Sequence, residues 1–279
     1  MRRVLAVLVG CVGPMTLLAC GGGGVEPTTT LVPTETLTPA PATKTPFPTL
    51  TPTPEVRANE AIVVGGDLRV RSGPSTSAPE VGTLEDKSVV VIDRAEQGEN
   101  WLVGSQTWVA TAPDWTRTWF RLTDGSYVYA GFVFILQPGE QSPLIDPGEY
   151  EKWIDVNVST QRARAMVGDT VVYEALVSTG SPSFASPIGK HRLGYRTSVE
   201  RMTAAQAGYS PGEATYDVER VLFTQYYTDQ GDALHLNYWR PVSVFGRTAT
   251  SHGCVGMQLH DAQWLWLFGE EGMRVEVHS

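Results

Sequence analysis

The stretch Thr250-Ser251-His252-Gly253-Cys254-Val255-Gly256-Met257, close to the C-terminus, organises the chain because it contains the cysteine expected to be chemically available. The other two cysteines, Cys11 and Cys20, lie in an N-terminal segment with the pattern of an export signal. Neither is therefore expected as a disulfide partner of Cys254. A lone thiol in an exported protein requires a chemical explanation, and we interpret Cys254 as an acyl-transfer nucleophile.

A cysteine attacks acyl carbons as its thiolate, so it needs a base or a positive environment. Two histidines are well placed in the sequence: His252, two residues before Cys254, and His235, 19 positions upstream. Gly253 permits a tight turn that projects the thiol and directs backbone N–H groups at a developing oxyanion. On these residues alone, a buried turn with an inert cysteine is the alternative.

The spacing of these residues resembles that of a known family. His235-Leu236-Asn237-Tyr238-Trp239, then Phe245-Gly246 and Ser251-His252-Gly253-Cys254, resemble the L,D-transpeptidase (YkuD) pattern of a histidine, about fifteen residues and Ser/Thr-His-Gly-Cys. Between His235 and Ser251 there are 15 residues. Ser178-Thr179-Gly180 with Ser186-Pro187-Ile188-Gly189 resembles the Ser-Thr-Gly and Thr-Pro-x-Gly region of that family. The resemblance covers about residues 150–279.

The resemblance implies a mechanism and a substrate. Cys254 would be the nucleophile, His235 the general base, His252 and Gly253 the scaffold of the thiol and oxyanion hole, and Ser251 a residue that orders the turn. The family acts on peptidoglycan stem peptides, releasing a terminal D-alanine and passing the acyl group to an amine to give a 3-3 cross-link. No cofactor or metal is implied. Water as acceptor would make the same site an L,D-carboxypeptidase.

One position departs from the pattern. The family commonly has Arg or Asn two positions after the cysteine, where this chain has Gly256, so a side-chain contact to substrate or scaffold is missing. Tyr227, Tyr238 and Trp239, together with Tyr226, are candidate cleft residues, although core packing explains each about as well.

Two other functions fit parts of the sequence. The first is a cysteine peptidase of the NlpC/P60 type, in which the cysteine precedes the histidine; here only His260 and His278 follow Cys254, and neither has motif context. Both, like His191, are expected to be surface or structural residues. The second is an inactive wall-binding lipoprotein, with Gly256 as a mark of lost activity.

The N-terminal 57 residues have the composition of a signal and a tether. Residues 1–20 combine Arg2 and Arg3 with an apolar run and end in Leu17-Leu18-Ala19-Cys20, which resembles the bacterial lipobox and implies lipidation of Cys20 and a membrane anchor. Ordinary signal cleavage is the alternative. Residues 21–57 are rich in Thr and Pro and cannot bury a core, so we expect a linker, either a spacer into a cell wall or a flexible tail.

Residues 58–137 contain short alternating apolar runs separated by turn signals, which predict a small β-barrel. Strands are expected at 62–64, 68–71, 81–84, 89–93, 101–103 and 108–110. The segment from Asp67 to Ser75, followed by Val81-Gly82-Thr83-Leu84, resembles the bacterial SH3-like (SH3b) domain, which implies peptide or peptidoglycan binding. Its tryptophans are as well explained by core packing.

Residues 148–279 form the predicted catalytic domain. Strands are expected at 153–158, 170–177 and 273–277, with a hairpin turn at 167–169 and a short helix capped by Asp261. Residues 190–225 lack a clear pattern and suggest an insertion or lid. The expected fold class is mainly β: a small SH3-like barrel followed by a β-rich YkuD domain with a short C-terminal helix.

Composition agrees with this organisation. The 279 residues, with 42% apolar residues, 28 glycines and 19 prolines, suit about two turn-rich β domains. The formal charge of -9 argues against a nucleic-acid partner, because phosphates require a basic surface. An extracytoplasmic protein held at the cell wall is expected, and the sequence indicates no oligomeric state.

Overall fold

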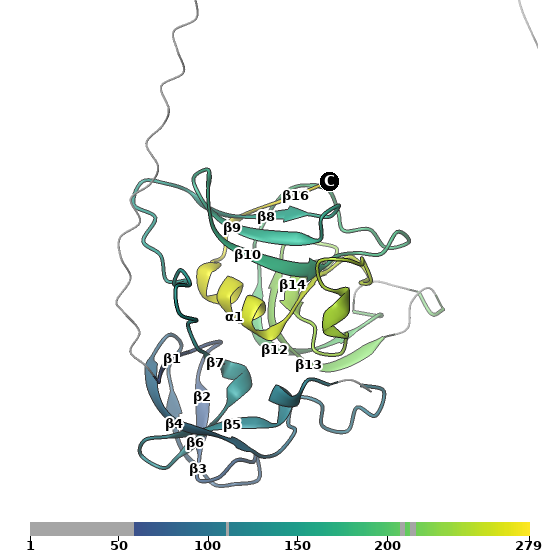
Figure 1. The fold of residues 1–279 in the computed structure, drawn as a ribbon. Coiled ribbons are helices and arrows are strands. Elements are labelled where there is room, and N and C mark those ends of the chain that lie inside the picture. The colour runs from purple at the N-terminus through teal and green to yellow at the C-terminus, as the bar shows by residue number, and fades with distance from the viewer. Residues whose placement is uncertain (1–58, 110–111, 207–209, 213–215) are drawn as a thin grey trace, which may run out of the picture. The chain divides into compact units, whose positions relative to one another are not determined.

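The computed structural model describes residues 59–109, 112–206, 210–212 and 216–279. The predicted signal segment with Cys20 and the predicted Thr/Pro-rich linker lie outside the described residues. Within the described ranges, no helix is long and apolar enough to cross a membrane. The fold is mainly β with one short α-helix near the C-terminus, which confirms the predicted class (Figure 1).

Seven strands form the first sheet, in the order β3-β2-β6-β5-β4-β1-β7. They are β1 (Glu60–Val63), β2 (Leu68–Arg71), β3 (Glu80–Leu84), β4 (Val89–Gln97), β5 (Thr118–Leu122), β6 (Tyr127–Tyr129) and β7 (Val133–Phe134), with 3-10 helices η1 (Asp114–Arg117) and η2 (Ala130–Phe132). In β2, Leu68 and Val70 are buried while Arg69 is exposed. This alternation is the period-2 signal that made the strand predictable.

The strand predicted at 101–103 is wrong, and so is the one predicted at 108–110 in its described residues 108 and 109. The backbone there forms turns, because Gly104 N–H donates to the Asn100 carbonyl and Val103 N–H donates to Asn100 Oδ1. Gly104 has φ +54°, which a strand does not contain. Leu102 is nevertheless completely buried, so the apolar signal was that of a packed loop.

Nine strands form the second sheet, in the order β11-β16-β8-β9-β10-β15-β14-β13-β12. They are β8 (Lys152–Asn157), β9 (Arg162–Val167), β10 (Thr170–Ser178), β11 (Gly189–Arg192), β12 (Arg196–Thr203), β13 (Asp217–Tyr226), β14 (Ala233–Leu236), β15 (Val255–Met257) and β16 (Arg274–His278). A 3-10 helix, η3 (Val242–Val244), precedes β15. The predicted hairpin at 167–169 is present, with Val167 paired to Thr170 and Gly168 at φ +56°.

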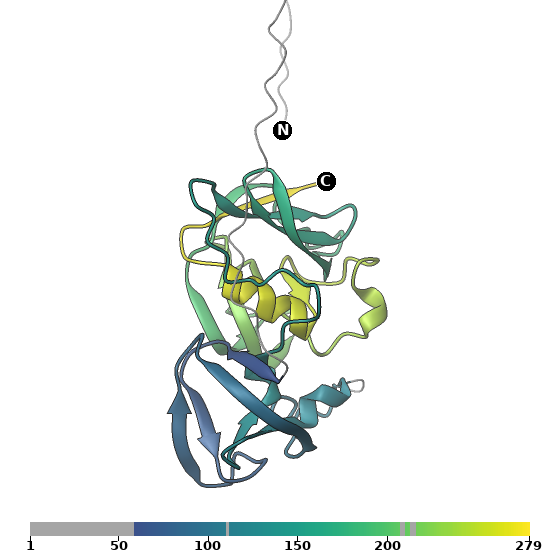
Figure 2. The ribbon, with the colours of Figure 1, turned by 60° about the vertical axis from the view of Figure 1, so that its left-hand side comes forward.

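Helix α1 (Leu259–Phe268) packs against β13, β14 and β7. Figures 1 and 2 show it between the β8–β10 part of the second sheet and the β12–β14 part. Its residues Ala262, Trp264, Leu265 and Phe268 are completely buried. The predicted cap by Asp261 is wrong: the N-cap is Gln258, and Asp261 lies within the first turn, where its carboxylate accepts a hydrogen bond from Tyr173 Oη at 2.7 Å.

The segment 190–225, interpreted as an insertion or lid, contains most of β11 together with β12 and β13. The last two pair as a long antiparallel hairpin with a bulge between Glu200 and Met202. The segment is therefore part of the second sheet, and the end of this hairpin reaches the cavity described below.

Candidate active site

Cys254 and His235 are brought together by two neighbouring parallel strands. In the β14–β15 pair, Leu234 is opposite Val255 and His235 is opposite Gly256. Side chains alternate along a strand, so His235 and the residue two before Gly256, which is Cys254, project to the same face of the sheet. The fifteen-residue spacing thus corresponds to the connection between these strands.

Both side chains line one cavity of about 1110 Å³. Its wall also includes His252, Asn237, Trp239 and Arg240 from the second sheet and its loops, Met202 to Ala205 and Tyr216 from the β12–β13 hairpin, and Ser105, Gln106 and Trp108 from the loop after β4. The rings of Trp108 and Trp239 meet edge to face, with centroids 6.5 Å apart. The cavity is large enough for an extended peptide segment.

The turn that carries the thiol is held by hydroxyl groups. Ser251 Oγ accepts the N–H of Gly253 at 3.2 Å and donates to the Cys254 carbonyl at 2.5 Å. Ser186 Oγ donates to the Gly253 carbonyl at 2.5 Å, and Tyr227 Oη donates to the same oxygen at 3.4 Å. Because the N–H of Gly253 donates to Ser251, this amide is engaged within the turn and is not left available for an oxyanion.

Gly253 occupies a position that excludes other residues. Its φ is +118°, and a β-carbon there would lie 2.1 Å from Asp232 Oδ1. Both the backbone conformation and the neighbouring carboxylate therefore require glycine. Asp232 is in turn fixed by Thr228, whose hydroxyl donates to its Oδ2 at 2.8 Å.

The Ser178-Thr179-Gly180 segment supports the turn from the side. The Thr179 carbonyl accepts the N–H groups of Thr250 and Ser251 at 3.0 and 3.1 Å. Ser178 Oγ donates to the Thr248 carbonyl at 2.8 Å, and Gly180 pairs with Ser251 as an isolated parallel bridge. The two segments that share the family resemblance are therefore adjacent in space.

The thiol and the imidazole are both neutral near pH 7. Burial raises the pKa of Cys254 from 9 to about 12, with smaller contributions from Asp232 and Glu200. Burial likewise lowers the pKa of His235 from 6.5 to about 4. Cys254 is a free, half-buried cysteine whose Sγ lies 3.8 Å from the Gly231 carbonyl. The site thus holds a neutral thiol and a neutral base in one cavity.

The tautomer of His235 follows from its hydrogen bond. Its Nδ1 lies 2.8 Å from the Leu236 carbonyl, which can only accept, so Nδ1 carries the proton. The neutral ring then has its lone pair on Nε2. The ring also stacks on Trp239, with centroids 5.7 Å apart and an angle of 14° between the planes. These two contacts fix the orientation of the imidazole.

His252 lies in the cavity wall between two aromatic rings. Its ring centroid is 4.6 Å from that of Phe184 and 5.0 Å from that of Tyr216. Burial lowers its pKa, and Arg240 lowers it further, so His252 is disfavoured as a cation. Its position suits a role in shaping the cavity beside the thiol.

The candidate substrate residues separate into two groups. Trp239 lines the cavity, whereas Tyr227 and Tyr238 are only 3% and 1% exposed and do not. Tyr227 bonds the turn as described, and Tyr238 Oη donates to the Glu219 carbonyl at 2.9 Å. The structure therefore places both tyrosines in the core, because their hydroxyls are satisfied by backbone carbonyls. Tyr226 Oη instead bonds the Glu200 carboxylate at 3.0 Å.

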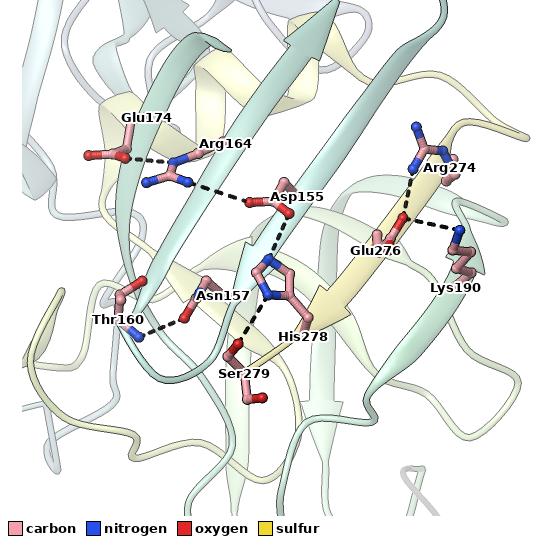
Figure 3. Close-up of polar contacts among 10 residues, drawn as sticks. All are labelled: Asp155, Asn157, Thr160, Arg164, Glu174, Lys190, Arg274, Glu276, His278 and Ser279. Carbon is pink, nitrogen blue, oxygen red and sulfur yellow. Dashed lines mark hydrogen bonds and ion pairs between the residues drawn. The ribbon is translucent and has the colours of Figure 1, made fainter. Parts of the chain in front are cut away.

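The remaining histidines have structural partners. His260 Nε2 lies 2.7 Å from Glu140 Oε1, and His191 Nε2 lies 3.0 Å from the Pro187 carbonyl. Figure 3 shows His278 of β16 beside Asp155 of the neighbouring strand β8, and Nε2 lies 2.8 Å from Oδ1. None of the three lines the cavity.

Several cavity and turn residues were not predicted as site residues. Asp232 and Gln106 lie in no motif, and Trp108 was predicted within a strand. Asn237 and Ser186 lie in segments of the family resemblance, but no role was assigned to either. Within the described part of the chain, no group of three or more His, Cys, Asp or Glu side chains is arranged to hold a metal ion.

Comparison with known proteins identifies the domain that carries this site. Residues 151–277 match the family model of YkuD, the L,D-transpeptidase catalytic domain. The prediction of a YkuD catalytic domain in this part of the chain is thereby confirmed. A comparison with curated proteins finds no match.

Similar solved structures include three mycobacterial proteins. L,D-transpeptidase 1 of Mycobacterium tuberculosis is 18% identical, with a TM-score of 0.39, over 47% of this chain and 63% of that one. An L,D-transpeptidase from Mycobacterium smegmatis is 15% identical, with a TM-score of 0.43, over 78% of this chain and 95% of that one. L,D-transpeptidase 3 of M. tuberculosis is 12% identical, with a TM-score of 0.43, over 78% and 94%.

Proposed function

We propose that the protein is a peptidoglycan L,D-transpeptidase that forms 3-3 cross-links through an acyl-enzyme on Cys254. The observation that carries the proposal is the placement of Cys254 and His235 on one face of two paired strands, in one cavity, within the matched family domain. A thiol and an oriented neutral base are what acyl transfer requires.

The first half of the reaction transfers the acyl group to sulfur. Nε2 of His235 accepts the thiol proton as Sγ attacks the carbonyl of the diamino acid at position three of the stem peptide. When the tetrahedral intermediate collapses, the C–N bond to D-alanine breaks and the proton passes to the departing amine. Because both groups are neutral at rest, proton transfer accompanies the attack.

The second half returns the enzyme to its starting state. An amine of a neighbouring stem peptide attacks the thioester, gives a proton to His235, and forms the amide of the cross-link while Sγ leaves and is reprotonated. Ser251 and His252 hold the turn and the cavity wall in this scheme. For Gly253 to stabilise the oxyanion, its N–H must either give up the hydrogen bond that it donates to the Ser251 hydroxyl or share it with the oxyanion.

The NlpC/P60 alternative is disfavoured by the histidines that follow Cys254. His260 and His278 are bonded to Glu140 and Asp155 and lie outside the cavity, so neither is positioned to activate the thiol. An L,D-carboxypeptidase would use the same residues with water as acceptor, and its product would identify it.

The location and accessory parts belong to the same proposal. A lipidated Cys20 would hold the protein at a membrane, residues 21–57 would span toward the wall, and residues 58–137 would act as an SH3b wall-binding domain. The enzyme would then work outside the cytoplasm on its polymeric substrate. In the inactive-lipoprotein alternative, the anchor, linker and wall-binding domain have the same roles, but Cys254 catalyses no reaction.

Purified protein incubated with tetrapeptide-containing muropeptides tests the proposal. We expect 3-3 dimers by mass spectrometry, no product from Cys254→Ala, and a loss of at least about 100-fold in His235→Gln, in line with removal of a general base. His278→Gln is the matched control and should retain activity. Tripeptides without dimers would identify a carboxypeptidase, and absence of any turnover would overturn the proposal. Acylation of Cys254 by a carbapenem, read by intact mass, is a rapid first observation.

A further inference from the structure

We propose that Asn237 is a substrate-positioning residue, whose side-chain amide occupies the space left open by Gly256 and binds a peptide unit of the donor stem peptide beside Cys254. This inference rests on the proposed function and deepens it, because it assigns a substrate contact to a residue for which the sequence predicted no role. It also accounts for the departure from the family pattern at Gly256.

Gly256 and Asn237 share one small volume. A β-carbon on Gly256 would lie 2.8 Å from Asn237 Nδ2 and 3.0 Å from Asn237 Cβ, closer than ordinary packing allows. Gly256 does not have the positive φ that favours glycine, so its backbone would accept another residue. Glycine is therefore required here by the neighbouring side chain.

The Asn237 amide is buried but incompletely bonded. The residue is 4% exposed, and its Oδ1 has no hydrogen-bond partner among the described residues. Its backbone is held in place, since the N–H donates to the Met257 carbonyl at 2.8 Å. A buried polar atom without a hydrogen-bond partner destabilises the fold. A ligand that supplies the partner would be a physical reason for an asparagine at this position.

Asn237 lines the same cavity as His235 and Cys254, and it follows His235 by two residues along the chain. An unpartnered carbonyl-type oxygen requires an N–H donor and disfavours a carboxylate. A primary amide offers one acceptor and a donor group, which matches the C=O and N–H of a peptide unit. The stem peptide presents such units on both sides of the carbonyl that Cys254 attacks.

Steady-state kinetics with a tetrapeptide muropeptide tests the assignment in the full chain. We expect Asn237→Ala to lower kcat/KM for the donor by about 10- to 100-fold, the range for loss of hydrogen bonds from a buried group. The rate of Cys254 alkylation by iodoacetamide should change less than about threefold. This second readout would move if Asn237 only supported the site's structure.

The double variant Asn237→Ala/Gly256→Asn is the rescue. It returns an amide from the neighbouring strand after removing the closest contact, that with Asn237 Nδ2, and leaves the 3.0 Å approach of the two β-carbons to be relieved by a small shift. We expect kcat/KM at least about fivefold above that of Asn237→Ala. The single variant Gly256→Asn retains the clash and should be the least active. Wild-type kcat/KM in Asn237→Ala would overturn the inference, as would equal losses in turnover and alkylation, or a folded double variant without recovery.

Binding separates this inference from the proposed function. In the Cys254→Ala background, Asn237→Ala should weaken tetrapeptide binding by a similar factor, measured by calorimetry. If the wild-type protein does not turn over the peptide but Cys254→Ala binds it, the proposed function fails and the Asn237 assignment is decided by the binding change. If the wild-type protein shows no turnover and Cys254→Ala shows no binding, both the proposed function and the Asn237 assignment are overturned. Should the double variant not fold, the kinetic and binding effects of Asn237→Ala decide the outcome.

Discussion

The resting protonation state of Cys254 can be measured by its reaction with iodoacetamide. Thiolates react and thiols do not, so the rate reports the fraction of Cys254 that is ionised. Burial raises the pKa of this thiol to about 12, and the neighbouring base is neutral because burial lowers the pKa of His235 to about 4. We therefore expect slow alkylation at neutral pH.

The size of the effect follows from the two pKa values. Each pH unit below the pKa lowers the thiolate fraction tenfold, so a pKa of about 12 against an ordinary value of 9 makes the thiolate about 1000-fold scarcer at pH 7.5. Burial disfavours the charged form of both groups, so we expect no imidazolium–thiolate pair in the resting site.

The assay compares folded and urea-unfolded protein between pH 6 and pH 10, with Cys254 followed by peptide mass spectrometry. The folded rate should rise about tenfold per pH unit without a plateau, and His235→Gln should leave this profile unchanged. Limited access to the half-buried thiol would lower the whole profile without changing its slope. A fast, pH-independent rate near pH 7 that disappears in His235→Gln would refute the reasoning, because it would reveal a resting ion pair.

Two further predictions concern stability. Burial raises the pKa of Asp261 to about 6 from 3.8, so its contribution to stability is present below pH 3.8 and is lost as pH rises through 6. Above pH 6, Asp261→Asn should therefore raise the free energy of unfolding, measured in urea, by up to about 3 kcal/mol. At pH 3.5 it should give no gain in stability. An equal gain at both pH values would contradict burial of the carboxylate as the cause. Gln106 is 8% exposed, donates to Tyr238 Oη at 2.8 Å and accepts the Glu219 N–H at 2.9 Å. Gln106→Ala should cost about 1–3 kcal/mol in urea unfolding, because buried polar groups lose partners, whereas exposed Gln97→Ala should cost less than about 0.5; equal costs would exclude the Gln106 contacts as the cause.

The sequence placed Cys254 and His235 in one candidate site because the signal is local on each side. Ser251-His252-Gly253-Cys254 encodes a turn that needs glycine and a hydroxyl, and His235 lies in a short apolar strand. Their meeting depends only on adjacent parallel strands, which the fifteen-residue interval permits. The strands that alternate clearly, such as β8 and β10, were predictable for the same reason.

The errors occur where tertiary contacts decide the local structure. The loop containing Leu102 is apolar because it is buried, and its turns are set by Asn100 and Gly104 rather than by alternation. Asp261 has the residue type of a helix cap, yet Tyr173 uses its carboxylate inside the first turn. A sequence contains the donor and the acceptor of such contacts but does not indicate that they meet.

The contact between Asn237 and Gly256 is another contact that the sequence does not indicate. It changes how the departure from the family pattern at Gly256 is interpreted. Taken alone, Gly256 suggests a lost contact and supports the inactive-lipoprotein alternative. In the structure, the volume beside Gly256 is filled by Asn237, a residue of the cavity wall that directly follows β14. A decaying site has no reason to retain a buried amide oxygen without a partner, because an apolar side chain of similar size would remove that cost. The pair therefore favours an active enzyme with rearranged substrate contacts, and recovery in the Asn237→Ala/Gly256→Asn variant is the result that separates rearrangement from loss.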